Sequence, residues 1–376
     1  MSRSMPSAGK PIESLVAELR RAHPELEAVR EAASDPAYVV GGAVRDLLLG
    51  RDRVDLDLVV EGDAAALAAR LGGAPVEHER FGTATVEVAG HEVDVASARS
   101  ETYARPGALP DVSVPADIEA DLGRRDFTLN AMAIPLAGEP QLIDPHGGEA
   151  DLQAGRLRVL HERSFIDDPT RAIRAARYAA RFGFGLEPET ERLLRAAELG
   201  SVSAERREAE LLRLAGEPTA VDGFRLLGEW GLVELRPIGV ELAAQVDDLL
   251  GRAIWSGLAP RGHALLAAAL GPAAGERELA AAAPVRPSEA VEIARHRDPV
   301  ELVLARALGA EWLDEYIGAW RAVALEIDGS DLIAAGVPEG PALGRGLEAA
   351  LRAKLDGEVD GREQELAAAL AAARGE

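Results

Sequence analysis

The sequence predicts an α+β protein in which an N-terminal mixed β-sheet is followed by a chain that is helical to its end. Strand-like apolar runs alternate with glycine turns only before Asp151. Beyond Asp151, apolar residues recur at helical spacing. The chain of 376 residues is long enough for two or three domains with large cores. We therefore expect a sheet-bearing head and a long helical body.

The composition is that of a globular protein, 47% hydrophobic and 28% charged. The absence of cysteine excludes disulfides, thiolate metal sites and a cysteine nucleophile. No apolar run reaches the roughly 18–20 residues that span a membrane. The start of the chain lacks the hydrophobic core of a secretory signal: MSRSMPSAGKPIESL. We expect a cytoplasmic protein with no membrane association.

The net charge of −23 argues against indiscriminate coating of nucleic acid, because phosphate contacts need cations. The distribution of charge matters more than its sum. Arginines are dense between Arg156 and Arg213, whereas acidic residues concentrate elsewhere. An RNA-binding surface is therefore compatible with the sequence.

The predicted elements of the head follow one another closely. Two helices, Ile12–Ala22 and Glu25–Ala33, precede the first strand. Next come the strand Tyr38–Val40, the Gly41–Gly42 turn, a helix from Ala43, a second strand with Asp55 and Asp57, a helix capped by Asp63, the hairpin Thr83–Val88/Glu92–Ala96, a loop over Arg99–Ile118 and a buried segment Leu129–Pro135. Later helices are predicted at Asp168–Phe182, Pro188–Ala197, Ala204–Ala215, Thr219–Trp230, Val240–Ile254 and Arg261–Leu270.

The pair Asp55 and Asp57 is the first chemical signal. Residues two apart on a strand project from the same face, so the two carboxylates lie side by side. They repel each other unless a cation lies between them, and such oxygen ligands suit Mg²⁺ with substrate phosphates. The pattern alone also fits a solvated strand edge. The glycine turn just before it offers backbone N–H groups to phosphate, which favours nucleotidyl transfer.

Asp94 is the candidate third carboxylate, on the second strand of the predicted hairpin. Strand pairing can bring it beside Asp55 and Asp57, where it can ligate a second metal or polarise a hydroxyl. The alternative is an exposed strand acid like Glu92.

Arg125 lies in the segment DLGRRDFTLNA, after Arg124 and before an apolar stretch. The neighbouring Asp126 can hold an arginine in place. A guanidinium near metal-binding carboxylates suits triphosphate oxygens, although a surface salt bridge is the alternative.

The segment DDPTRAIRAARYAARFGF predicts a helix with Asp168 as its N-cap. Its four arginines share one face, at spacings of 3, 3 and 4 residues: Arg171, Arg174, Arg177 and Arg181. Because like charges on one face repel, the pattern favours an anion-binding surface over a solvated helix.

These motifs resemble those of the class II tRNA nucleotidyltransferases, which are the CCA-adding enzymes, and of bacterial poly(A) polymerases. The resemblance rests on GGAVRDLLLG followed by DLDLVVEGD, on RRDFTLNA, and on DDPTR. It runs from about Tyr38 to Leu194 and again from about 327 to 366. It implies template-independent addition of the 3′-terminal CCA of tRNA from CTP and ATP, with Mg²⁺ as cofactor, pyrophosphate as product and no obligate protein partner.

The resemblance also implies the roles of individual residues. Asp55, Asp57 and Asp94 would be catalytic, with Mg²⁺ on Asp55 and Asp57. The nucleotide would be bound by Gly41, Gly42, Arg45, Arg125, Asp168, Arg171, Arg174 and Arg177. Cytosine and adenine each present an amino donor beside a ring-nitrogen acceptor, which matches the carboxylate of Asp168 and the guanidinium of Arg171. Uracil and guanine present the reverse and would leave polar groups unpaired.

The same resemblance suggests a division of the chain. It comprises an N-terminal helical extension (1–35), a nucleotidyltransferase head (36–148), a neck for base selection and RNA binding (149–215), a helical body (216–298) and a tRNA-binding tail (299–376). The tail contains a Gly/Pro-rich turn between two helices, which fits either a phosphate contact or a plain helical hairpin.

The product is open at this stage. Enzymes of this family that add only CC lack the flexible loop that Arg99–Ile118 provides here, which favours full CCA or terminal A. We favour full CCA, although the DDPTR spelling, with Asp167 where many relatives have glutamate, is associated with A-adding relatives. A poly(A) polymerase, a small-molecule nucleotidyltransferase and a non-catalytic RNA-binding module are the alternatives.

Overall fold

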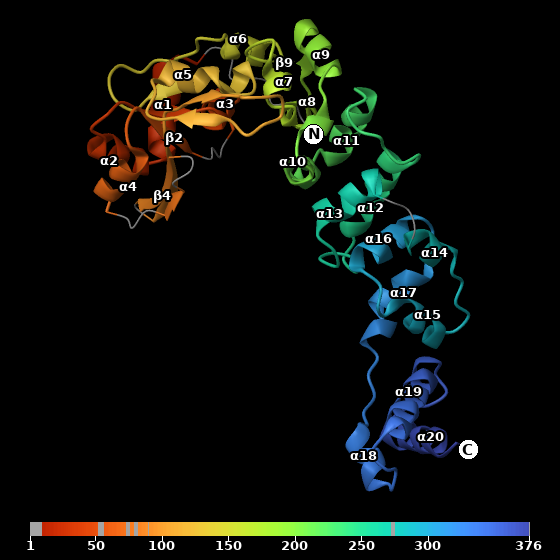
Figure 1. The fold of residues 1–376 in the computed structure, drawn as a ribbon. Helices are drawn as coiled ribbons and strands as arrows, with labels where there is room; N and C mark the ends of the chain where they lie inside the picture. Colours follow the sequence, from red (N-terminus) through yellow and green to blue (C-terminus); the bar gives the residue numbers. More distant parts are fainter. Residues whose placement is uncertain are drawn as a thin grey trace. The chain divides into compact units, whose positions relative to one another are not determined.

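A computed structural model describes residues 10–51, 56–72, 76–78, 82–88, 90–271 and 275–375. The chain forms two compact units, one up to Val233 and one from Glu234 onward. The first holds the β-sheet, drawn in orange to yellow in Figure 1, and the described part of the second is helical. The predicted α+β class, with a mixed-sheet head before a helical remainder, is confirmed. The finer division into neck, body and tail stays a prediction.

A six-stranded sheet forms the centre of the head, in the order β3-β4-β5-β2-β1-β8. Its strands are β1 (Ala37–Val40), β2 (Asp57–Val60), β3 (Val76–His78), β4 (Thr83–Val88), β5 (His91–Ser97) and β8 (Ala133–Pro135). β2 runs parallel to β5, and the other neighbours pair antiparallel. The all-apolar strand β1 is buried along its length between β2 and β8, as expected for a central strand.

Short helices surround the sheet. They are α1 (Ile12–Ala22), α2 (Glu25–Ala32), α3 (Gly42–Leu48), α4 (Ala64–Arg70), α5 (Ile118–Gly123), the 3₁₀ helix η1 (Thr128–Asn130) and α6 (Gly148–Gln153). The predicted cap of α4 is confirmed, because the Asp63 carboxylate accepts hydrogen bonds from the backbone N–H groups of Ala65 and Ala66. The predicted hairpin of β4 and β5 is confirmed as well.

The prediction that Arg99–Ile118 is a loop was wrong in part. The segment contains two short strands, β6 (Ser100–Thr102) and β7 (Asp111–Ser113), which pair antiparallel. Their residues are mostly polar, so no apolar alternation marked them. Arg99, the connection between the strands and the residues between β7 and α5 lack regular structure.

Helices complete the first unit: α7 (Ser164–Asp167), α8 (Thr170–Phe182), α9 (Pro188–Arg195), the 3₁₀ helix η2 (Leu199–Ser201), α10 (Ala204–Gly216) and α11 (Ala220–Glu229). A small parallel pair, β9 (Arg156–Leu157) and β10 (Gly185–Leu186), lies among them. α8 packs against α10 and α11, and its apolar residues such as Ile173 and Ala176 are buried. α8 begins two residues later than predicted, but the Asp168 carboxylate still accepts a hydrogen bond from the Thr170 N–H.

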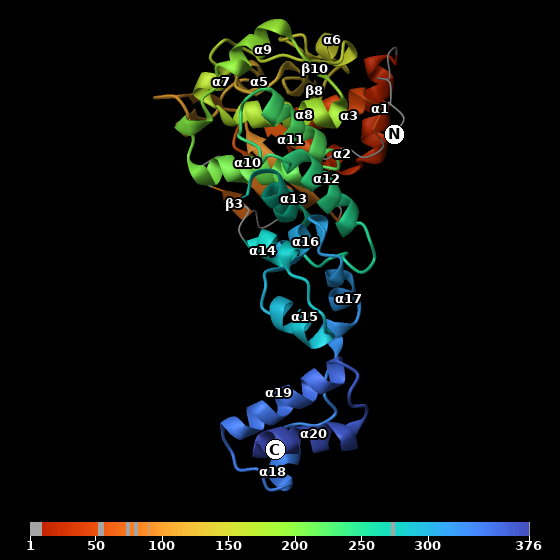
Figure 2. The same cartoon turned by 90° about the vertical axis from the view of Figure 1, so that its right-hand side faces the viewer.

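The second unit contains α12 (Gly239–Leu250), α13 (Arg261–Leu270), α14 (Gly275–Ala281), α15 (Pro287–Ala294), α16 (Pro299–Ala307), α17 (Trp312–Gly318), the 3₁₀ helix η3 (Trp320–Ala322), α18 (Gly329–Ala334), α19 (Pro341–Leu355) and α20 (Arg362–Arg374). The last three helices pack together around Leu332, Ala350 and Ala369 (Figure 2). None of the described helices combines the length and apolar character needed to cross a membrane.

Candidate active site

A cavity of about 950 Å³ in the first unit gathers residues that are far apart in the sequence. Its wall includes most of the residues predicted for the site: Gly42, Arg45, Asp57, Arg125, Asp168, Arg171, Arg174 and Arg177. Gly41 and Asp94 lie beside wall residues but are not part of the wall. Asp55 lies outside the described residues.

Two carboxylates stand next to each other at the sheet end of this cavity. Asp57 on β2 is the direct register partner of Asp94 on β5, so the predicted approach of these two positions is confirmed. Both residues are exposed, and Asp94 Oδ1 accepts a hydrogen bond of 2.6 Å from the Thr85 hydroxyl on β4. Exposed carboxylate oxygens on adjacent strands have the donor chemistry of a divalent-cation site. Among the described residues alone, no group of three or more potential ligands is close enough to hold a metal ion.

The glycine turn lies against Arg125. Gly41 has a positive φ of 63°, and a Cβ atom there would be 2.3 Å from Arg125 Nη1. A Cβ atom on Gly42 would instead lie 3.8 Å from Asp57 Oδ2. The first glycine therefore leaves room for an arginine, and the second brings the start of α3 close to a carboxylate.

Arg45 lies on α3 with its guanidinium buried and paired. Its Nε and Nη2 donate to the two carboxylate oxygens of Asp46, each at 3.0 Å, and Nη1 donates to Asn130 Oδ1 at 2.5 Å. The guanidinium also stacks on the rings of Tyr178 and Phe182. Arg45 therefore presents a fixed positive charge at the cavity wall.

Asp121 fixes the two arginines of the RRDF segment. Its buried carboxylate accepts hydrogen bonds from Arg124 at 2.7 Å and from Arg125 at 2.8 Å. Burial alone would raise the pKa of Asp121, but the charges of both arginines outweigh it and lower that pKa. Arg124 also donates to Glu101 at 3.0 Å, which ties β6 to this cluster.

Asp126 holds an arginine in place, as the sequence suggested, and the partner is Arg174 of α8. Arg174 Nε donates to Asp126 Oδ2 at 2.8 Å, while Asn130 donates to the other oxygen at 2.9 Å. Burial opposes ionisation of Asp126, but Arg174 and Asn130 prevail and lower its pKa to about 2. The same pairing raises the pKa of Arg174. Arg174 is thus an anchored part of the wall.

The predicted base-reading pair, Asp168 and Arg171, also lines the cavity. Asp168 Oδ1 accepts hydrogen bonds from the Thr170 hydroxyl at 2.7 Å and from Arg206 at 3.0 Å. Arg171 is buried and donates to the Ser164 hydroxyl at 2.8 Å and to the Arg124 carbonyl at 2.6 Å. The last bond links α8 to the RRDF segment, so both readers are held from outside their own helix.

The cavity wall is locally positive although the chain is strongly acidic. Within the described part of the chain it carries ten arginines and seven acidic residues. The predicted arginine face is confirmed, since Arg171, Arg174, Arg177 and Arg181 all belong to the wall. A concave surface of this charge suits a polyanion such as a nucleoside triphosphate.

Sequence reasoning missed residues that hold the predicted ones, namely Asp46, Arg206 and Glu210 in the wall and Asp121 behind it. It also missed Glu101, a wall residue that holds Arg124. Asp121 could have been found, because it precedes Arg124 and Arg125 by only three and four residues, at the end of α5. Arg206 and Asp168 are 38 residues apart, and no local signal joins them.

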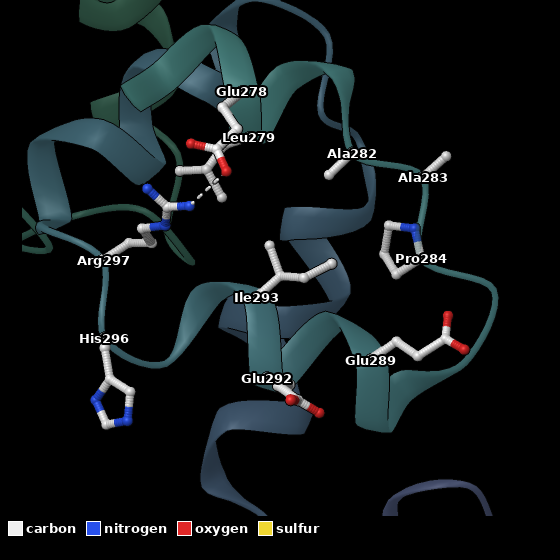
Figure 3. Close-up of a pocket in the computed structure, with 10 residues that line it drawn as sticks. All are labelled: Glu278, Leu279, Ala282, Ala283, Pro284, Glu289, Glu292, Ile293, His296 and Arg297. Carbon is white, nitrogen blue, oxygen red and sulfur yellow. Dashed lines mark ion pairs between the residues drawn. The ribbon is translucent and has the colours of Figure 1, made fainter. Parts of the chain in front are cut away.

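A second hollow, of about 720 Å³, lies in the second unit between α14 and α15 (Figure 3). Its described wall combines apolar residues such as Leu279 and Ile293 with three glutamates. Arg297 there is paired with Glu278 at 3.3 Å. This charge disfavours phosphate groups, so the candidate active site is the cavity of the first unit.

The mixed sheet with paired carboxylates shares its cavity with the arginine face of α8. This combination defines the first unit as a nucleotidyltransferase. Residues 37–158 match the family described as "Poly A polymerase head domain". A CC-adding tRNA nucleotidyltransferase of Deinococcus radiodurans is 35% identical over 364 residues, which cover 92% of this chain and 89% of the relative. The chain therefore belongs to the tRNA nucleotidyltransferase family.

Two further likenesses refine this placement. An A-adding tRNA nucleotidyltransferase of Halalkalibacterium halodurans is 46% identical over 203 residues, which cover 50% of this chain. The chain spans 47% of the length of that relative. The solved structure of the apo form II of a CCA-adding enzyme aligns with a TM-score of 0.81 at 29% identity, covering 96% of this chain and 99% of the other. The relatives thus differ in product, while 96% of the chain aligns with the fold of a CCA-adding enzyme.

Proposed function

We propose that this protein adds nucleotides to the 3′ end of tRNA without a template, completing or repairing the terminal CCA from CTP and ATP. The observation that carries the proposal is that Asp57 and the pair Asp168 and Arg171 line one cavity. Carboxylates suited to a cation and a pair suited to reading a base are thereby within reach of one bound nucleotide. Solved CCA-adding enzymes similar to this chain are complexes with tRNA, ATP and CTP. We also propose that the protein acts in the cytoplasm, since its substrate would be tRNA.

In this proposal the sheet side performs the transfer. The tRNA 3′-hydroxyl loses its proton to solvent and attacks the α-phosphorus, a new P–O bond forms, and pyrophosphate leaves with the electron pair of the broken P–O bond. Asp55 and Asp57 would hold Mg²⁺, with Asp94 beside Asp57. When bound, Mg²⁺ activates the hydroxyl and neutralises charge on the phosphates. Arg125, positioned by Asp121 and next to Gly41, reaches the triphosphate.

The neck side selects the base. The carboxylate of Asp168 accepts from the exocyclic amino group of C or A, and Arg171 donates to the adjacent ring nitrogen. Uracil and guanine place a carbonyl and an N–H there, so both pairings fail. Arg174 and Arg177, on the same face of α8, contact the rest of the nucleotide.

The base-selection step is tested by comparing ATP with GTP and CTP with UTP on tRNA transcripts. Asp168→Ala and Arg171→Ala should each lower the preference for C and A by about tenfold or more, since a site built to hydrogen-bond loses discrimination with its partner. Arg192→Ala, which removes an exposed arginine paired with Glu189, is the matched control. Full selectivity in both single variants would refute the Asp/Arg reader.

The product needs its own experiment, because relatives of this chain add A, CC or CCA. Full CCA is our proposal, since β6, β7 and their connection occupy the Arg99–Ile118 segment. Members of the family that add only CC lack a flexible loop at this place. Addition of A alone is the second candidate, favoured by identities of 46% and 50% to A-adding relatives over about half of the chain.

Three tRNA transcripts separate these outcomes: one ending before CCA, one after C and one after CC, each offered CTP, ATP or both. A full CCA enzyme extends all three to the same end. Extension of only the CC-ended transcript, and only with ATP, would establish an A-adding enzyme. Long A tails on unrelated RNA would indicate a poly(A) polymerase, and no incorporation at all would leave the RNA-binding module.

A further inference from the structure

Arg206 joins two segments of the first unit at the cavity wall. It lies on α10, where Nη1 donates to the Gly107 carbonyl at 2.9 Å and Nη2 donates to Asp168 Oδ1 at 3.0 Å. Gly107 is itself fixed, because its N–H donates to the Ile166 carbonyl and a Cβ atom there would lie 2.5 Å from the Ser201 carbonyl oxygen. One end of the Arg206 guanidinium is therefore bound to an immobile backbone acceptor, while the other end holds a carboxylate.

The hydrogen bonds of Asp168 are distributed unevenly between its two oxygens. Oδ1 accepts from the Thr170 N–H at 3.1 Å, from the Thr170 hydroxyl at 2.7 Å and from Arg206. Among the described residues, no donor is hydrogen-bonded to Oδ2. A carboxylate is planar, so fixing Oδ1 at three donors also fixes the direction of Oδ2.

We infer that Arg206 is a positioning residue for base selection. It orients Asp168 so that Oδ2 remains available to accept from the amino group of C or A. This inference rests on the proposed function and deepens it. Both Thr170 donors come from the residue after next, so they tie Oδ1 only to its own chain segment. Arg206 instead approaches from another helix and ties the carboxylate to α10.

The test measures kcat/KM for ATP and for GTP on a CC-ended tRNA transcript, in wild type and in Arg206→Met, Arg206→Gln and Arg206→Lys. In Arg206→Met the ATP-to-GTP ratio should fall at least about tenfold, mainly through a higher KM for ATP, because a misdirected acceptor weakens binding of the correct base. Arg206→Lys keeps a charged donor and should recover part of the ratio. Arg207→Met, at the adjacent position on α10 and outside the cavity wall, is the control and should leave the ratio unchanged.

Other outcomes overturn the inference. If Arg206→Met slows ATP and GTP equally and keeps the wild-type ratio, while Asp168→Ala loses that ratio, Arg206 serves stability alone. Should Arg206→Met fail to fold, Arg206→Gln decides: a lowered ratio supports the inference and a wild-type ratio refutes it. A wild-type protein inert with every nucleotide overturns the proposed function itself, which separates that failure from a failure at Arg206.

Discussion

The two sides of the cavity place their charges by different means. On the sheet side, Asp57 and Asp94 are exposed and lie opposite each other through strand register. On the helical side, Arg171 and Arg174 are held by side chains and carbonyls from outside α8. Backbone pairing thus positions the carboxylates, whereas long-range side-chain contacts position the arginines.

This difference fits what each side would bind in the proposed function. Carboxylates that are to hold a cation need exposed oxygens, so a rigid backbone must place them. Arginines that are to receive phosphates would repel one another without anions, so acids such as Asp46, Asp121 and Asp126 hold them in the absence of ligand. Part of the net charge of −23 therefore lies within the arginine cluster and does not oppose RNA binding.

The largest effect is expected on the sheet side. Asp57→Ala should lower nucleotide incorporation by at least about a hundredfold, because loss of a metal ligand removes stabilisation of the transition state. Binding of tRNA, measured by filter retention, should be nearly unchanged. Glu92→Ala, which removes another exposed strand carboxylate, is the control. An Asp57→Ala protein with more than a hundredth of the wild-type rate would contradict the metal role.

On the helical side, the ion pair of Asp126 and Arg174 should contribute to the free energy of unfolding. The pKa of Asp126 in the folded protein is about 2, below its ordinary value of 3.8. The pair therefore stabilises the fold above about pH 4, by about 2 kcal/mol, and this contribution is lost as pH falls toward 2. Asp126→Asn should lack it throughout.

Urea unfolding of wild type and Asp126→Asn between pH 2 and pH 7 measures this. The gap in the free energy of unfolding should be widest near neutrality and should shrink below pH 4. A gap that stays constant down to pH 2 would show that the charge of Asp126 is not what stabilises Arg174.

The next largest effect is expected at Gly41, in the turn before α3. Gly41→Ala places a methyl group 2.3 Å from Arg125 Nη1, so Arg125 must move. We expect the KM for the nucleoside triphosphate to rise about tenfold. Gly72→Ala is the matched control, since Gly72 also has a positive φ, of 86°, but nothing lies within 4 Å of its added Cβ. Both variants lose stability from the backbone, and equal KM values in the two would remove Gly41 from the site.

The sequence predicted those parts of the site that local periodicity determines. The alternation of side chains on strands predicted that Asp57 and Asp94 could lie side by side, and helical spacing predicted the arginine face of α8. It did not reveal the partners of that face, because Asp126 and Arg174 are 48 residues apart and meet only through packing.

The missed strands β6 and β7 have the same cause. Their residues are largely polar and carry no period, and Glu101 of β6 is held by ion pairs with Arg99 and Arg124. Contacts of this kind appear only once the chain is folded.

The smallest effect tests whether backbone register alone is sufficient on the sheet side. Thr85 is the exception there, since its hydroxyl donates to Asp94 Oδ1 at 2.6 Å. Thr85→Val keeps the shape and the strand preference of the side chain and removes only the hydrogen bond. We expect the incorporation rate to fall less than about tenfold, with unchanged stability, because an exposed hydrogen bond contributes little and the register of β5 is intact.

A double-mutant cycle shows whether Thr85 acts through Asp94. Asp94→Ala should lower the rate more than Thr85→Val does, and adding Thr85→Val to Asp94→Ala should change nothing further, because the hydroxyl then has no carboxylate to orient. Equal losses from Thr85→Val in both backgrounds would mean that Thr85 acts on its own. A Thr85→Val protein as fast as wild type would mean that strand register alone places Asp94, and the contrast between the two sides of the cavity would then be complete.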